Sequence, residues 1–68
     1  MTARNVMHDV VRVGDTIICH GEYREVTAIV EYAPGEAPAD APIRADYWTW
    51  EYRTRAGSRW RGFPTRPD

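Results

Sequence analysis

The sequence predicts an all-β fold made of about five short antiparallel strands. Three observations lead to this prediction. β-Branched and aromatic residues recur in short runs, and Gly, Pro or Asp, which favour turns, stand between the runs. The composition, with 43% hydrophobic, 28% charged and 12% aromatic residues, is that of a globular domain.

The chain has room for one hydrophobic core. At 68 residues, it buries only about 60% of the surface that its unfolded form exposes, so we expect modest stability unless a partner or a dimer adds to it. We expect an N-terminal arm at residues 1–9, a single domain at residues 10–68, and a monomer or weak homodimer.

Two strands separated by a tight turn are expected near the start of the domain. The valines at positions 10, 11 and 13 are expected to form a strand, Gly14-Asp15 a bend, and residues 16–20 the next strand. Gly21-Glu22 then suits a two-residue type II′ turn. This turn would place Ile17 opposite Val26 and Cys19 opposite Arg24.

Residues 24–32 are expected to continue from this turn as one long alternating strand. Side chains alternate between the two faces of a strand. The face shared with Ile17 would carry Val26, Ala28, Val30 and Tyr32. The opposite face would carry Thr27, Ile29 and Glu31, of which Ile29 is an apolar exception that requires partial cover.

Residues 33–46 predict a long Pro/Ala loop. Ala-Pro recurs at positions 33–34, 37–38 and 41–42, and this segment cannot pair into a sheet. Its prolines recur every fourth residue, so they do not form the single ridge of a polyproline II ligand. Two interpretations stay open: a tolerated insertion or a functional loop.

Residues 47–63 predict an aromatic, arginine-rich hairpin, which holds all three tryptophans and the only phenylalanine. A three-residue loop at residues 55–57 would separate its two faces. One face would carry Trp48, Trp50, Tyr52 and Trp60, as core or as a stacking platform. The other would carry Thr49, Glu51, Arg53, Arg59 and Arg61. A loop one residue shorter or longer would mix arginines with aromatics, which is costly to bury.

The arginine side of this hairpin is the candidate binding surface. In the expected register, Arg53 lies directly opposite Arg59, a like-charge pair that destabilises a sheet. Phosphate groups, an acidic partner protein or the chain's own acidic residues would relieve the repulsion. The candidate nucleic-acid-binding or partner-binding residues are Arg53, Arg55, Arg59, Arg61 and Trp60.

Charge is unevenly distributed along the chain. The formal net charge is −1, which argues against coating nucleic acid or an anionic membrane by bulk attraction. Residues 1–46 hold four Arg and eight acidic residues, whereas residues 47–68 hold five Arg and two. All nine basic residues are arginines, which suit planar carboxylate, phosphate and base-edge contacts.

No catalytic, metal or cofactor site is predicted. Cys19 is the only cysteine, so there is no internal disulfide and no zinc knuckle. Cys19 and His20 are neighbours on a strand and would point to opposite faces, and the histidines lack metal-ligand spacing. We therefore expect a non-enzyme without membrane segments or a signal peptide, in the reducing cytoplasm.

The opening of the domain resembles small SH3-like barrels, among them KOW-type and Tudor-type modules and small barrel proteins of actinobacteria and their phages. The similarity rests on Val-x-Val-Gly-Asp at Val11–Asp15 followed by a Gly-turned hairpin, and covers residues 11–32. It implies a small β-barrel acting as a non-catalytic binding module, and it transfers no specific binding residue. The Ala-Pro loop departs from the family pattern.

The expected function is therefore a non-catalytic module that contacts nucleic-acid phosphates through the arginine-rich hairpin. The alternative is a protein-interaction module, such as a phage or bacterial accessory factor that docks on a larger protein.

Overall fold

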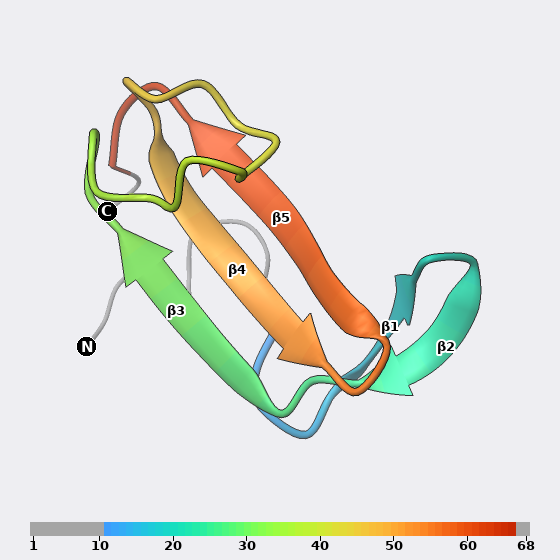
Figure 1. Ribbon diagram of the computed structural model, residues 1–68. Helices are drawn as coiled ribbons and strands as arrows, with labels where there is room; N and C mark the ends of the chain where they lie inside the picture. The colour runs from blue at the N-terminus through green and yellow to red at the C-terminus, as the bar shows by residue number, and fades with distance from the viewer. Residues whose placement is uncertain (1–10, 67–68) are drawn as a thin grey trace.

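The computed structural model describes residues 11–66, which form five antiparallel strands and no helix (Figure 1). The strands are β1 (Thr16–Cys19), β2 (Glu22–Glu25), β3 (Ala28–Tyr32), β4 (Trp48–Thr54) and β5 (Gly57–Phe63). The β1–β2 hairpin is one sheet, and the strands β3-β4-β5 form the other. The all-β class and the number of strands are confirmed. The strand expected at the valines 10, 11 and 13 is wrong, because residues 11–13 belong to no strand and β1 begins at Thr16. The expected arm at residues 1–9 lies outside the described residues.

The first hairpin turns one residue earlier than predicted. Cys19 pairs with Glu22 and Ile17 with Arg24, so the turn residues are His20 and Gly21. Both have positive φ, 53° and 83°, as a type I′ turn requires. Gly21 therefore fills the second positive-φ position of a type I′ turn, and not the first position of the expected type II′ turn at Gly21-Glu22. The register moves by two residues, so the buried side of β1 is unchanged.

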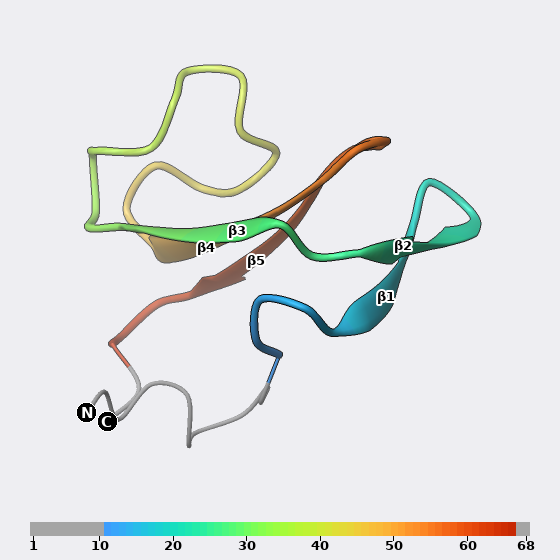
Figure 2. The same cartoon turned by 90° about the horizontal axis from the view of Figure 1, so that it is seen from below.

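The predicted strand over residues 24–32 is broken at Val26–Thr27. Val26 is fully buried and its N–H donates to Asp15 O at 2.8 Å, which extends the first hairpin. The N–H of Thr27 instead donates to Arg53 O at 2.8 Å, at the end of β4. The chain thus passes from one sheet to the other between two adjacent residues, as the bend between β2 and β3 in Figure 2 shows.

This bend reverses the predicted faces of β3. Ile29 packs against the core and pairs with Tyr52, whereas Val30 pairs with Glu51 on the opposite face. Strict alternation counted from Val26 predicted the reverse, because the prediction assumed a straight strand across the bend. Tyr32 also lies on the face away from the core, where its ring stacks on Trp60.

The second hairpin has a two-residue turn, at Arg55 and Ala56, instead of the predicted three-residue loop. Thr54 pairs with Gly57, and Thr54 Oγ1 accepts from the Ala56 N–H and donates to Gly57 O at 3.0 and 2.8 Å. Every residue of β5 therefore lies on the face opposite to the predicted one. The arginine pair at 53 and 59 does not form, because Arg53 pairs with Ser58 and Arg59 with Tyr52.

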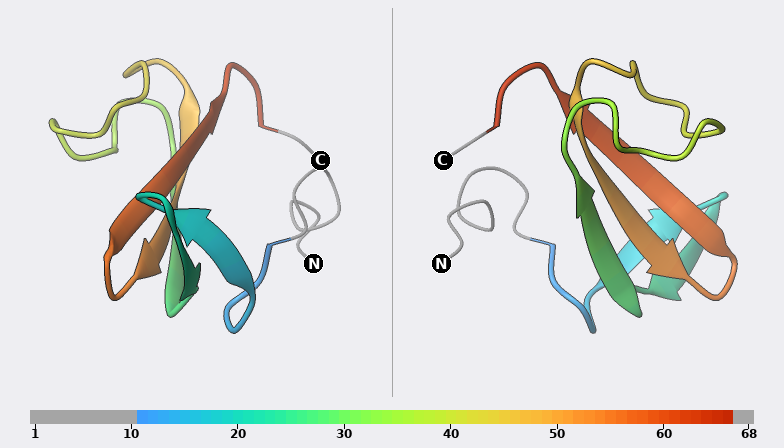
Figure 3. Two further views of the ribbon diagram at one scale, coloured as in Figure 1. Left: turned by 90° about the vertical axis from the view of Figure 1, so that its right-hand side faces the viewer. Right: turned by 60° about the vertical axis from the view of Figure 1, so that its left-hand side comes forward.

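The core lies between the two sheets. Figure 3 shows the β1–β2 hairpin crossing one face of the three-stranded sheet. That face carries the aromatic side chains of β4, which pack against β1 and the bend. The buried cluster comprises Ile17, Val26, Trp50 and Tyr52, flanked by Val11, Ile29, Trp48 and Phe63. Trp60, expected among these aromatics, lies on the other face.

The loop at residues 33–46 folds over the outer face of the three-stranded sheet, the face away from β1 (Figure 2). Its Ile43 side chain occupies the space that a Cβ at Gly62 would need, and the Tyr47 ring lies beside it. Thr49, opposite Gly62, is fully buried. The segment is a loop, as predicted, and it contributes packing to the sheet.

The described strands form no closed barrel. Closure would require the first and last strands to pair, but in residues 11–66 β5 forms a ladder with β4 alone. The side chain of Arg59 does reach β1, where its Nη1 lies 3.4 Å from Ile18 O. No helix long and apolar enough to cross a membrane is found in residues 11–66.

Candidate binding surface

The open side between the two sheets contains a hollow of about 250 Å³. Its lining combines apolar and aromatic side chains, Val11, Ile17 and Tyr52, with the two arginines Arg59 and Arg61. The two arginines are separated by one residue on β5, so their side chains leave the strand on the same face. An anionic group that entered this hollow would lie near two positively charged side chains.

Arg59 and Arg61 can face the core because they stand on an edge strand. Arg59 is exposed, and Arg61 is half-buried with its guanidinium 5.2 Å from the centre of the Phe63 ring. The long aliphatic stem of arginine can cover apolar surface while its head stays in water. The cost of arginine burial that favoured the three-residue loop is therefore not incurred at this open edge.

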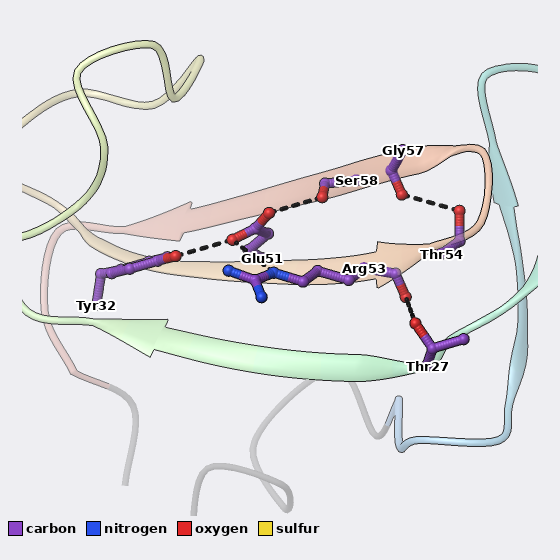
Figure 4. A network of polar contacts seen from close by, with 7 residues as sticks. All are labelled: Thr27, Tyr32, Glu51, Arg53, Thr54, Gly57 and Ser58. Carbon is purple, nitrogen blue, oxygen red and sulfur yellow. Dashed lines mark hydrogen bonds and ion pairs between the residues drawn. The ribbon is translucent and has the colours of Figure 1, made fainter.

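Arg53 lies on the opposite face of the sheet and belongs to a polar network around Glu51 (Figure 4). The buried Glu51 carboxylate accepts hydrogen bonds from Tyr32 Oη at 2.8 Å and from Ser58 Oγ at 2.7 Å. Arg53 Nε is 3.3 Å from the same carboxylate. Arg53 thus neutralises a residue of its own sheet.

The surroundings of Glu51 favour its charged form. Burial alone raises the pKa of Glu51, but the hydrogen bonds from Ser58 and Tyr32, together with the charge of Arg53, outweigh it and hold the pKa below its ordinary value. The carboxylate therefore stays ionised at neutral pH and links β3, β4 and β5.

Arg55 lies at the turn between β4 and β5 and forms no ion pair with the described residues 11–66. It lines a shallow depression of about 550 Å³ together with Tyr23, Arg24, Glu25 and Thr27. Tyr23 is 75% exposed. This second surface combines an open aromatic ring with two arginines, although Arg24 pairs with Glu22.

Trp60 is half-buried on the outer face, where its ring stacks on Tyr32 with centroids 6.2 Å apart. The five candidate residues are thus distributed over three places. Arg59 and Arg61 line the hollow, Arg53 and Trp60 lie on the outer face, and Arg55 is at the turn.

Sequence reasoning missed an exposed apolar pair on the first hairpin. Ile18, 50% exposed, pairs with Tyr23 across the hairpin, and both side chains point away from the core. The sequence does contain a signal for this exposed pair: if Ile17 and Cys19 face the core, strand alternation leaves Ile18 on the exposed face.

Cys19 is buried at the end of β1, whereas His20 is exposed in the turn. Within residues 11–66, no group of three His, Cys, Asp or Glu side chains is arranged to hold a metal ion.

Comparison of the chain with protein-family models, with curated proteins and with solved structures gave no match.

Proposed function

We propose that this domain is a non-catalytic protein-interaction module that binds an acidic polypeptide segment at the open side between its two sheets. The observation that carries the proposal is the hollow that Arg59 and Arg61 line together with Tyr52, Ile17 and Val11. A ligand for this hollow needs carboxylates for the two arginines and apolar groups for the apolar and aromatic part of the lining.

The charge of the whole chain favours a protein ligand. A nucleic-acid-binding domain draws most of its affinity from many phosphate contacts, whereas this chain has a net charge of −1 and places its arginines on separate faces. Arginine and tyrosine beside apolar side chains are also enriched in protein interfaces.

An SH3-like architecture is part of the same proposal. Five antiparallel strands in two sheets and the sharp bend at Val26–Thr27 support it. The gap between β1 and β5, which a ladder would have to close, is bridged by the contact of Arg59 with Ile18 O.

The test measures binding of fluorescent acidic and neutral peptides by anisotropy. Replacing either hollow arginine with glutamine should weaken acidic-peptide binding by up to roughly tenfold, because an ion pair at an exposed or half-buried arginine is worth up to about 1 kcal/mol and the lower bound of a charge-assisted hydrogen bond is about 1.5 kcal/mol. Arg44→Gln is the matched control, since Arg44 is exposed in the loop and pairs with Asp46. Equal affinity for acidic and neutral peptides, or equal losses in Arg59→Gln and Arg44→Gln, would overturn the proposal.

Nucleic-acid binding is the second candidate, favoured by the exposed Tyr23 ring beside Arg24 and Arg55. An aromatic ring flanked by arginines can stack a base and hold the adjoining phosphates. Titration of single- and double-stranded DNA and RNA at increasing salt tests it, with Tyr23→Ala and Arg55→Gln as variants. Binding at low salt that both variants weaken would support this function, and no binding at any salt would reject it.

A further inference from the structure

Strand β5 lies at the edge of the three-stranded sheet and forms a ladder only with β4 among the described residues 11–66. In a two-residue hairpin the pair that flanks the turn, here Thr54 and Gly57, exchanges backbone hydrogen bonds. The backbone N–H and C=O groups of Ser58, Trp60 and Gly62 then point outward. The first hairpin lies against the start of β5, where Arg59 Nη1 is 3.4 Å from Ile18 O and a Cβ at Gly57 would meet the His20 ring. Trp60 and Gly62 are therefore the part of the edge with which a further strand could pair. An edge of this kind is a template for another strand.

The two sides of this edge differ in chemistry. On the side of the hollow, the β5 side chains are Arg59 and Arg61. On the outer side stands Trp60, stacked on Tyr32. Side chains of a paired strand alternate between the same two sides. Those on one side of an added strand would therefore meet the two arginines, and those on the other side would meet Trp60.

We propose that β5 accepts an extended segment of a partner protein in which acidic residues alternate with apolar residues. The segment adds to the sheet beside β5, places its carboxylates next to Arg59 and Arg61, and lays an apolar side chain beside Trp60. Backbone hydrogen bonds supply affinity and the alternating side chains set the register. This inference rests on the proposed function, that the hollow binds an acidic polypeptide.

The same edge fits two other occupants less well. Antiparallel pairing of β5 with β5 of a second copy would bring Arg59 and Arg61 of both copies together, and like charges across a ladder are destabilising. A nucleic-acid strand lacks the regularly spaced N–H and C=O groups that complete a β-ladder. An acidic, extended polypeptide satisfies both the edge and the arginines.

The experiment compares two blocked octapeptides of identical composition with the full chain. In one, Glu and Val alternate, and in the other all Glu residues precede all Val residues. The alternating peptide should bind at least about tenfold more tightly, because only it places every carboxylate on the side of the arginines. In the Arg59→Gln variant this preference should shrink, and in Arg44→Gln it should persist.

Backbone methylation tests whether the peptide binds as a strand. In a ladder only every second peptide N–H faces β5. N-methylation of the Val amides and N-methylation of the Glu amides should therefore have unequal effects: one set should abolish binding and the other should leave it within about twofold. Hydrogen exchange at the Trp60 and Gly62 amides should also slow on binding.

The outcomes separate the two proposals. If the block peptide binds as tightly as the alternating one, and both lose affinity in Arg59→Gln, the hollow binds acidic segments but strand addition is wrong. Equal effects of the two methylation patterns also contradict strand addition. If neither peptide binds, both proposals fail. If sedimentation shows instead that the chain associates with itself through β5, as judged by slowed exchange at Trp60, a second copy is the occupant and strand addition by an acidic partner is rejected.

Discussion

The hydroxyl of Tyr32 donates a 2.8 Å hydrogen bond to the carboxylate of Glu51, 19 residues later in the chain. Tyr32 ends β3, Glu51 lies in the middle of β4, and the other carboxylate oxygen accepts from Ser58 of β5. One buried acidic group therefore joins all three strands of the sheet (Figure 4). Arg53, 3.3 Å away, supplies the counter-charge.

Removing the Tyr32 hydroxyl should destabilise the fold measurably. Tyr32→Phe keeps the ring on Trp60 but deletes a hydrogen bond to a charged, buried carboxylate, a loss of about 1.5–3 kcal/mol. Urea denaturation followed by tryptophan fluorescence measures it. Tyr23→Phe is the control, because Tyr23 is 75% exposed, and its midpoint should not move. Equal midpoints for both variants would show that the bond to Glu51 contributes nothing.

The Glu51 network should also make stability depend on pH. The folded-state pKa of Glu51 is lowered from the ordinary value of 4.5, so its contribution is fully present above pH 4.5 and is lost as the pH falls through the lowered pKa. Urea midpoints of the wild type should fall on acidification more steeply than those of Glu51→Gln. The control, Glu36→Gln in the exposed part of the loop, should follow the wild type. Parallel curves for wild type and Glu51→Gln would exclude this linkage.

The fold class and the positions of β1 and the long loop could be predicted from sequence because they depend on local signals. The run from Thr16 and the prolines after Ala33 mark a strand and a loop through residue type alone, and the structure has β1 and the long loop there. Such signals do not depend on what a segment packs against.

The register of the hairpin and the grouping of the arginines could not be predicted this way, because both depend on tertiary surroundings. A register error of one residue moves every side chain of β5 to the other face. The prediction treated arginine on the aromatic face as buried, whereas Arg59 lies at an open edge and reaches Ile18 O. The bend at Val26–Thr27 had a similar effect on β3, since no local residue signal announced the change of sheet.

The free energy that the Ala-Pro loop contributes by packing on the sheet can be tested by substitution at Gly62. A methyl group there would overlap the Ile43 side chain, so Gly62→Ala should cost about 1–3 kcal/mol of folding free energy through overpacking. In the Ile43→Ala background the space is vacated, and the same substitution should cost clearly less. Urea denaturation of the four variants gives the coupling free energy of this double-mutant cycle.

Additive effects in that cycle would mean that the loop does not rest on Gly62. A control cycle can be built from Gly62→Ala and Pro38→Ala, since Pro38 is exposed in the same loop and the atoms nearest to a Cβ at Gly62 belong to Ile43 and Tyr47. That pair should be additive.

The bend between the sheets should control how often the first hairpin opens, and Cys19 offers a chemical probe of this motion. Cys19 is 2% exposed on the inner side of β1. Val26 is fully buried at the bend, and its N–H donates to Asp15 O, just before the start of β1. Val26→Ala should remove about 1.5–3 kcal/mol of apolar burial and accelerate reaction of the thiol with a disulfide reagent under native conditions. Val13→Ala, at a site 60% exposed, should change neither quantity. Thiol reaction at the wild-type rate in a destabilised Val26→Ala variant would show that the hairpin opens independently of the bend.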